Sequence, residues 1–309
     1  MKVSIIFNKK QVYKSITNGF IYLFLLILIT IQTISCTTSN NEIQKIDVSE
    51  LRITFAVTDF SVGENRIAFA ILDPNKGVII PESMDVSTYH LDAKNPDNKI
   101  ETLETTFRQW PNGKGVYTVN ANFNKSGKWG IGINLFHNKK FHGISTFIIV
   151  PENSQTPPIG SKAPTVETKT ISSVEEISEI TSAINPHLPL YEMSLKNSIE
   201  SKTPTIILFA TPAFCQTGTC GPQLDIMKSL SLRWHGQLNF IHSEIYSNPN
   251  DINGDISNAK ISKAAVKWNL PSEPWTFVID ESGKIISKFE GFVTAEELEE
   301  SIGFILNTK

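Results

Sequence analysis

Two cysteines five positions apart, Cys215 and Cys220, are the residues of this sequence whose type and spacing best suit chemistry. A pair of thiols can close a disulfide and exchange it with another molecule. The chain of 309 residues holds one further cysteine, Cys36. Three cysteines are too few for a disulfide-dense scaffold or for a closed zinc site made only of cysteine. The pair at 215 and 220 is therefore where we expect thiol chemistry.

The spacing of this pair restricts the backbone between the two sulfurs. In a regular helix, positions i and i+5 lie about 8–9 Å apart at Cα, which is beyond the limit of about 7 Å for a disulfide. A bond therefore requires part of the segment to be a loop, and Gly218 supplies the freedom for it. Pro222 suits the first turn of a helix, where a missing N–H costs nothing. We expect Cys215 on a loop after a strand, and Cys220 at or just before a helix start.

The elements that must position this pair alternate between strand and helix. The continuous apolar run at 205–210 suits a strand buried in the middle of a sheet. The later pattern predicts, in order, a helix at 222–234, a strand at 238–245, a helix at 261–268, a hairpin at 275–289, and a last helix opened by a capping box of Thr294 with Glu297.

This order of elements resembles the thioredoxin-like superfamily over residues 159–306, nearly half of the chain. Cys215 follows an apolar strand, as the active-site cysteine does in that family. Pro274 stands directly before a strand, in the place of the family's cis-proline, which packs against the active-site sulfurs. The hairpin after it, at 279–284, is similar as well. The resemblance implies redox roles for Cys215, Cys220 and Pro274, although the family motif has two residues between its cysteines and this chain has four.

Acidic side chains near the sulfurs form a second group of candidates. Thioredoxins carry a buried acid on the first central strand, but here that strand is apolar except for Thr205. The nearest acids are Glu273, adjacent to Pro274, and Glu244 on the next strand. A carboxylate close to a thiol raises the thiol's pKa, which would make this a slower attacking thiol than one in an electropositive pocket. Glu273 is a candidate site residue, and a solvated loop acid is the alternative.

The sequence leaves open which sulfur attacks. A helix N-terminus stabilises a thiolate, and the distance from the strand end favours Cys215. The string from Cys220 to Gln223, however, looks like the family motif with its second cysteine replaced, and this favours Cys220.

Four functions compete for this pair. Thiol–disulfide exchange is the first; a permanent structural bond in a binding module is the second, although so short a loop gains little entropic stabilisation. A peroxiredoxin is disfavoured because its flanking motif is absent: Leu208 and Pro212 stand at the two flanking motif positions. A copper chaperone is disfavoured because 272–276 contain no histidine. No phosphate-binding glycine loop occurs, so no cofactor is expected.

For the whole chain we predict two domains: an N-terminal antiparallel β-sandwich and a C-terminal domain with an α/β thioredoxin-like fold. The segments are an anchor at 1–36, an immunoglobulin-like β-sandwich at 47–150, a proline-rich linker at 151–164 and the thioredoxin-like domain at 165–309. About seven short alternating strands are expected in the sandwich. Its histidines, His90, His137 and His142, form no tight pair, so no metal is expected there.

The N-terminal segment has the pattern of an export signal. Four lysines precede an apolar run that ends in a small residue and Cys36, which resembles a bacterial lipoprotein signal; an uncleaved helical anchor and full secretion stay open. The remainder has 24 basic and 31 acidic residues, a net charge of −7, which argues against nucleic-acid binding. We expect a cell-membrane, extracytoplasmic location, with protein thiols or disulfides and a redox partner as the molecules it meets.

Overall fold

The computed structural model describes residues 50–111, 113 and 115–307. The predicted anchor segment at 1–36 and the lipidation of Cys36 lie outside these residues. Among the residues described, no helix is long and apolar enough to cross a membrane. The described residues belong to one compact unit, and the predicted division into two domains around 151–164 stays a prediction.

Two antiparallel sheets make up residues 52–150, with strand orders β1-β2-β7-β6 (β3 also pairs with β2) and β5-β4-β8-β9. Their strands are β1 (Arg52–Phe55), β2 (Gly63–Asp73), β3 (Gly77–Ile79), β4 (Ser83–His90), β5 (Lys99–Leu103), β6 (Thr106–Gln109), β7 (Gly115–Phe123), β8 (Gly127–His137) and β9 (Lys140–Val150).

Alternation along the strands builds the core between these two sheets. In β8, Trp129, Ile131 and Ile133 are buried at every second position, as the period of a strand requires. They pack with Phe69 of β2 and Phe123 of β7 in one hydrophobic cluster. The two sheets thus share one apolar interior, which is the sandwich arrangement predicted for this stretch.

Nine strands occupy this stretch, where about seven were expected. The run at β4 was not identified because it is mostly polar: Val86 is its one fully buried large apolar side chain, and Met84 packs against the core while partly buried. β3 spans three residues, which is too short for an alternating pattern to be visible in a sequence.

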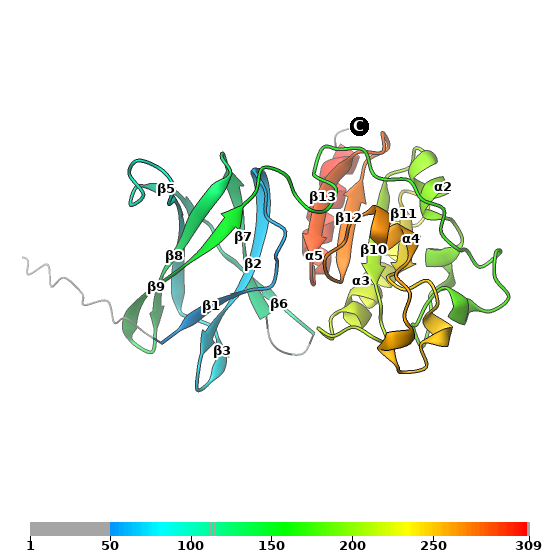
Figure 1. Cartoon of the computed structure of the whole chain (residues 1–309), viewed down its shortest axis with the longest axis horizontal. Helices are drawn as coiled ribbons and strands as arrows, with labels where there is room; N and C mark the ends of the chain where they lie inside the picture. Colours follow the sequence, from blue (N-terminus) through cyan, green and yellow to red (C-terminus); the bar gives the residue numbers. More distant parts are fainter. Residues whose placement is uncertain (1–49, 112, 114, 308–309) are drawn as a thin grey trace, which may run out of the picture. The chain divides into compact units, whose positions relative to one another are not determined.

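A third sheet has the order β11-β10-β12-β13. β10 and β11 are parallel, and β12 is antiparallel to both β10 and β13. Figure 1 shows the four strands side by side. The elements from here on are η1 (Ile177–Glu179), η2 (Leu188–Tyr191), α2 (Leu195–Glu200), β10 (Thr205–Ala210), α3 (Cys220–Arg233), β11 (Asn239–Glu244), η3 (Pro249–Asp251), η4 (Ile256–Asn258), α4 (Lys263–Lys267), β12 (Trp275–Ile279), β13 (Ile285–Glu290) and α5 (Ala295–Asn307).

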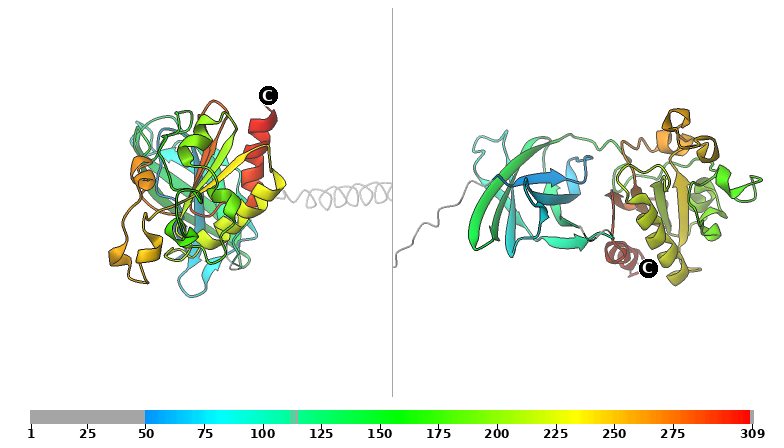
Figure 2. Two further views of the ribbon diagram at one scale, coloured as in Figure 1. Left: turned by 90° about the vertical axis from the view of Figure 1, so that its right-hand side faces the viewer. Right: turned by 90° about the horizontal axis from the view of Figure 1, so that it is seen from below.

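Helices cover both faces of this sheet (Figure 2). Leu208 packs with Met227 of α3 and Ile302 of α5 in one cluster, whereas Phe209 packs on the opposite face with Trp268, next to α4. Every residue of β10 is buried, as its unbroken apolar sequence predicts. The predicted order of strand, helix, strand, helix, hairpin and helix is confirmed.

Element boundaries differ from the expected ones by a few residues. α3 begins at Cys220, two residues before the predicted start at Pro222, and α4 is shorter than expected. The capping box of α5 is confirmed. The Thr294 N–H donates to the Glu297 carboxylate at 3.2 Å, and the Glu297 N–H donates to the Thr294 hydroxyl at 3.4 Å.

The proline-rich segment at 151–164 is anchored along its length. Asp59 accepts hydrogen bonds from the Thr156 hydroxyl at 2.6 Å and from the Gln155 N–H at 2.8 Å. The same carboxylate forms an ion pair with Lys288 of β13 at 3.1 Å. Further along, the Ala163 N–H donates to the Gly283 carbonyl at 2.9 Å. These contacts fix what the sequence alone presents as a semi-extended linker.

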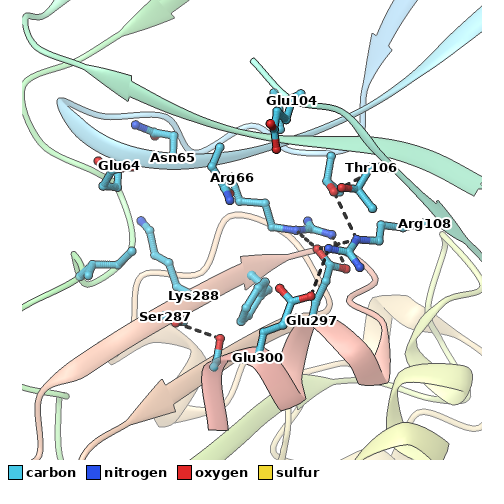
Figure 3. Close-up of a pocket in the computed structure, with 16 residues that line it drawn as sticks. Glu64, Asn65, Arg66, Glu104, Thr106, Arg108, Ser287, Lys288, Glu297 and Glu300 are labelled. Carbon is cyan, nitrogen blue, oxygen red and sulfur yellow. Dashed lines mark hydrogen bonds and ion pairs between the residues drawn. The ribbon is translucent and has the colours of Figure 1, made fainter. Parts of the chain in front are cut away.

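A buried ion pair joins the strand β2 to the helix α5, which lie far apart in the sequence. The Arg66 guanidinium donates to Glu297 through Nε at 2.7 Å and through Nη2 at 3.1 Å. Arg108 reaches the same carboxylate at 3.7 Å. Figure 3 shows both arginines directed at Glu297 in a cavity of about 490 Å³. Since the Arg66 and Glu297 side chains are only 9% and 6% exposed, each needs the other to balance its charge.

Replacing Glu297 by alanine is expected to lower the free energy of unfolding by about 3 kcal/mol, because it leaves the buried Arg66 unpaired and removes the α5 cap. Urea unfolding measures this loss. Glu300→Ala is the matched control, since Glu300 lies on the same helix with its side chain 70% exposed; a change within about 0.5 kcal/mol is expected there. Equal losses in the two variants would contradict the importance of the pair.

Candidate redox site

The two cysteines lie where the sequence places them. β10 ends at Ala210, a loop carries Cys215, and Cys220 is the first residue of α3. The two side chains form a disulfide with their Cα atoms 6.0 Å apart, within the range for such bonds. Gly218 has φ +69°, a left-handed conformation that glycine adopts without strain. The expectation of a loop at Cys215 and a helix start at Cys220 is confirmed.

The two sulfurs differ in their surroundings. Cys220 is fully buried, with 0% exposure, and packs in the cluster beneath α3, whereas Cys215 is partly exposed. The Thr217 hydroxyl lies 3.2 Å from the Cys215 sulfur and 2.8 Å from the Thr219 hydroxyl. A molecule in solution therefore has access to one sulfur, and hydroxyl groups are at hand to stabilise charge there.

The register of the sheet brings Pro274 and Glu273 to the cysteine loop. Trp275, the first residue of β12, pairs with Phe209 of β10, so the residues before it lie beside the end of β10. The peptide bond between Glu273 and Pro274 is cis, as the resemblance predicts for this proline. The two cysteine sulfurs and one carboxylate oxygen of Glu273 all lie within 4.8 Å of one another.

Burial raises the pKa of Glu273, because removal from water disfavours its charged form. Its Oε2 is buried and has no hydrogen-bond partner. A buried carboxyl oxygen without a donor is unusual in a folded protein. Glu273 thus combines this unpaired oxygen with a position beside both sulfurs, where the sequence predicts an acid.

Glu244, the second acid predicted near the pair, lies at the end of β11, opposite Ala210. It is 6% exposed and accepts hydrogen bonds from the Ser182 N–H at 2.9 Å and the Ser182 hydroxyl at 3.2 Å. Burial raises the pKa of Glu244 to about 7, and the charge of Glu273 contributes to that rise. The Thr211 hydroxyl opposes the rise in both pKa values.

His242 serves the structure, as its position on a strand predicts. Its Nδ1 lies 2.8 Å from the Tyr191 hydroxyl and its Nε2 lies 3.1 Å from the Ala210 carbonyl. Burial lowers the pKa of His242 to about 4, so the ring is neutral at pH 7. Both ring nitrogens are engaged, and the ring helps to fix the end of β10.

The loop that carries Glu273 is held in place by hydrogen bonds to a buried carboxylate, that of Glu290 in β13. The Ser272 hydroxyl donates to Glu290 at 2.7 Å, and the Thr58 N–H and hydroxyl donate to it at 2.6 and 2.8 Å. The Gly291 N–H also donates to the Pro274 carbonyl at 2.8 Å. Residues near the N-terminal strands thus contribute to the placement of the acid beside the sulfurs.

A cavity of about 430 Å³ lies beside Glu244 at the end of β11. Tyr191, Tyr246 and Ile261 give it a largely apolar lining, and Lys169 and Lys263 also line it. Glu244 itself is one of the residues that line this cavity.

Sequence reasoning missed the polar residues that support the site. Thr217 and Thr219 stand between the cysteines, and their alternation with Gln216 and Gly218 is a hydroxyl-rich signal that could have been used. Ser182 gives no such signal, because it lies in a stretch without a recognisable pattern, far from Glu244 in the sequence.

Side chains that could bind a metal form a cluster at this site, and no other such cluster occurs within residues 50–111, 113 and 115–307. There the only cluster of three candidate ligands is Cys215, Cys220 and Glu273. The three described histidines of the strand region, His90, His137 and His142, belong to no such cluster. Ring nitrogens of His90 and His142 lie near backbone carbonyls.

Comparisons with known proteins give likenesses of fold only. No protein-family model matches the chain, and no curated protein matches it. Among solved structures, it is similar to a protein described as the thiol:disulfide interchange protein DsbE from Chlorobium tepidum, with 16% identity over 48% of this chain and 98% of that one and a TM-score of 0.35. A DsbF homologue from Corynebacterium diphtheriae has 16% identity over 48% of this chain and 90% of that one, with a TM-score of 0.32.

The Lin-41 filamin domain is similar over 34% of this chain and 96% of that one, with 12% identity and a TM-score of 0.23. Likenesses this weak assign no function, so the function has to be inferred from the geometry of this chain.

The buried Glu244 predicts a pH-dependent stability. The folded chain holds the Glu244 proton up to about pH 7, whereas the usual pKa is 4.5. The stability from this group is therefore complete below pH 4.5 and lost as the pH rises through 7, by up to roughly 3 kcal/mol. Glu244→Gln cannot ionise, so its free energy of unfolding relative to the wild type should rise between pH 5 and pH 8 in urea titrations.

Glu200→Gln, at the exposed end of α2, is the matched control and should show no such trend. A constant difference between Glu244→Gln and the wild type across this range would refute the burial of a proton at Glu244.

Proposed function

We propose that this chain is a membrane-anchored, extracytoplasmic thiol–disulfide oxidoreductase that works through Cys215 and Cys220. The observation that carries the proposal is the bond itself. It joins a partly exposed sulfur to a fully buried one at the start of a helix, next to Pro274 and Glu273. A purely structural staple has no need of an accessible sulfur or of an acid beside it.

The exchange begins from the disulfide form. A substrate thiolate attacks the Cys215 sulfur, the bond between the two cysteines breaks, and Cys220 leaves as a thiolate that takes up a proton. A second substrate thiolate then attacks the substrate sulfur of the mixed disulfide and releases Cys215. The substrate dithiol loses two electrons and two protons, and the cysteine pair gains them. The same steps in reverse reduce a substrate disulfide.

Cys215 is the sulfur that meets the substrate. Cys220 has no exposed surface, and a thiolate in solution cannot align with a sulfur that it cannot reach. The α3 N-terminus lies at Cys220 and stabilises that sulfur as a leaving thiolate. Exposure therefore favours attack at Cys215, and the helix favours departure of Cys220.

Glu273 exchanges the proton of the buried thiol. Its carboxylate oxygen lies within 4.8 Å of both sulfurs, close enough for direct transfer or transfer through one water. Pro274, the next residue after Glu273 and joined to it by a cis peptide bond, is the residue that we propose to shape the surface on which a substrate rests.

The organisation of the chain follows from its sequence. We propose an immunoglobulin-like domain at 47–150 and a thioredoxin-like domain at 165–309, with the segment at 1–36 holding them at the extracytoplasmic face of the cell membrane, where Cys36 is the lipidated residue. Protein thiols or disulfides and a redox partner are the molecules that it meets. An oxidising compartment gives a disulfide-forming pair its use.

Single cysteine variants test the exchange. With dithiothreitol as reductant and a disulfide-bonded protein as substrate, Cys215→Ser should lose all reduction above background, because the attacking sulfur is gone. Cys220→Ser, reduced and then freed of dithiothreitol before the substrate is added, should instead accumulate a mixed disulfide with the substrate, visible on a non-reducing gel, because no second thiol of the chain resolves it. Cys36→Ser is the matched control and should keep wild-type activity.

A measurement of the reduction potential separates exchange from a structural bond. A potential well below about −300 mV, with no turnover by the wild type, would mark a permanent staple and exclude the proposed activity.

A further inference from the structure

Opening the disulfide leaves a concentration of acidic groups in one place. Two thiols are then adjacent to the Glu273 carboxylate, within the same 4.8 Å. Glu244 lies behind them and interacts electrostatically with Glu273. A buried negative charge is costly unless a positive group or a metal ion balances it.

No basic side chain supplies that balance. Across the described residues, no lysine or arginine forms an ion pair with Glu273 or Glu244. His242 is the nearest basic type in the sheet, but both of its nitrogens are engaged and the ring is neutral. Lys169 and Lys263 line the cavity beside Glu244, but among the described residues neither forms an ion pair with Glu244 or Glu273.

The three ligand atoms suit one particular ion. Thiolate sulfur at about 2.3 Å and carboxylate oxygen at about 2.0–2.2 Å are regular zinc contacts. A tetrahedral Zn²⁺ holds two sulfurs about 3.8 Å apart, and a pair with Cα atoms at 6.0 Å can open to that spacing through the loop at Gly218. Cu(I) prefers soft ligands and has little use for a carboxylate.

We propose that the dithiol form of this chain binds one Zn²⁺ through the sulfurs of Cys215 and Cys220 and a carboxylate oxygen of Glu273, with water in the fourth position. The inference rests on the proposed function in one respect, that the disulfide opens reversibly. One oxygen of the Glu273 carboxylate lies within 4.8 Å of both sulfurs, and Oε2 of the same carboxylate is buried without a hydrogen-bond partner, so this group has capacity left to bind a metal.

Binding involves no change of oxidation state. Each thiol gives up its proton, two Zn–S bonds form, and two protons pass to the solvent. The metal and the disulfide exclude each other, because both need the same two sulfurs. Reduction of the disulfide therefore creates the zinc site, and oxidation of the two cysteines releases the ion.

A competition titration with a chromophoric zinc chelator tests the site. Full-length chain reduced by dithiothreitol, then freed of it, should bind one Zn²⁺ per chain, and the oxidised chain should bind none. Glu273→Gln should weaken binding at least about tenfold, since the loss of even an outer partner of a ligand costs about that much. Glu273→Asp should retain part of the affinity, and Glu200→Gln, exposed on α2, should bind as the wild type does.

Substitution by Co²⁺ supplies a readout of the ligands. The sulfur-to-metal charge-transfer band should require both cysteines, and the visible bands should change in Glu273→Gln while its far-ultraviolet circular dichroism does not. Unchanged affinity in Glu273→Gln, or one ion shared by two chains, would overturn the proposal.

The two proposals fail in different ways. If dithiothreitol leaves the bond intact in the folded chain, both the exchange activity and the zinc site are wrong. If the bond opens and the chain exchanges disulfides but retains no Zn²⁺, only the zinc site is wrong.

Discussion

Cys220 is the first residue of α3, and the residues between it and Cys215 stay outside the helix, which keeps the two Cα atoms 6.0 Å apart. A helix that already included Cys215 would separate the same atoms by about 8–9 Å, and the bond could not close. Gly218 turns the chain in the left-handed region, and the fully buried β10 fixes where the loop begins. Access to one sulfur, burial of the other and the closeness of the acids all depend on this starting point.

Negative charge is the second property that shapes the site. In an electropositive pocket, a thiol ionises readily and attacks fast. Here Glu273 lies beside the sulfurs and interacts electrostatically with Glu244. Burial raises the pKa of both acids. The site therefore favours the closed bond, protonated thiols or a bound cation over free thiolates. This balance links the exchange chemistry and the zinc chemistry, since both are ways to avoid an uncompensated anion.

Much of the cysteine loop could be predicted from the sequence, because it follows from helix geometry alone: the 215–220 spacing requires a loop, and Pro222 requires a helix start nearby. The place of Pro274 followed from the order of elements. The distances could not be predicted. The meeting of Ser182, Glu244 and Glu273 depends on strand register between segments far apart in the chain. β4 escaped notice because its mostly polar sequence shows no alternating apolar pattern. The anchoring of the proline-rich segment could not be predicted because its contacts to Asp59 are hydrogen bonds that leave no periodic pattern in the sequence.

The burial of Cys220 exposes the two cysteines unequally to oxidants in solution. Peroxide from solution reaches Cys215 alone, and the sulfenic acid that forms there has a resolving thiol five residues away. Condensation of the two returns the pair to the disulfide and releases water, before further oxidation to the irreversible sulfinic or sulfonic acids. A fully buried partner thus acts as an internal repair group, which preserves the couple through repeated oxidative damage.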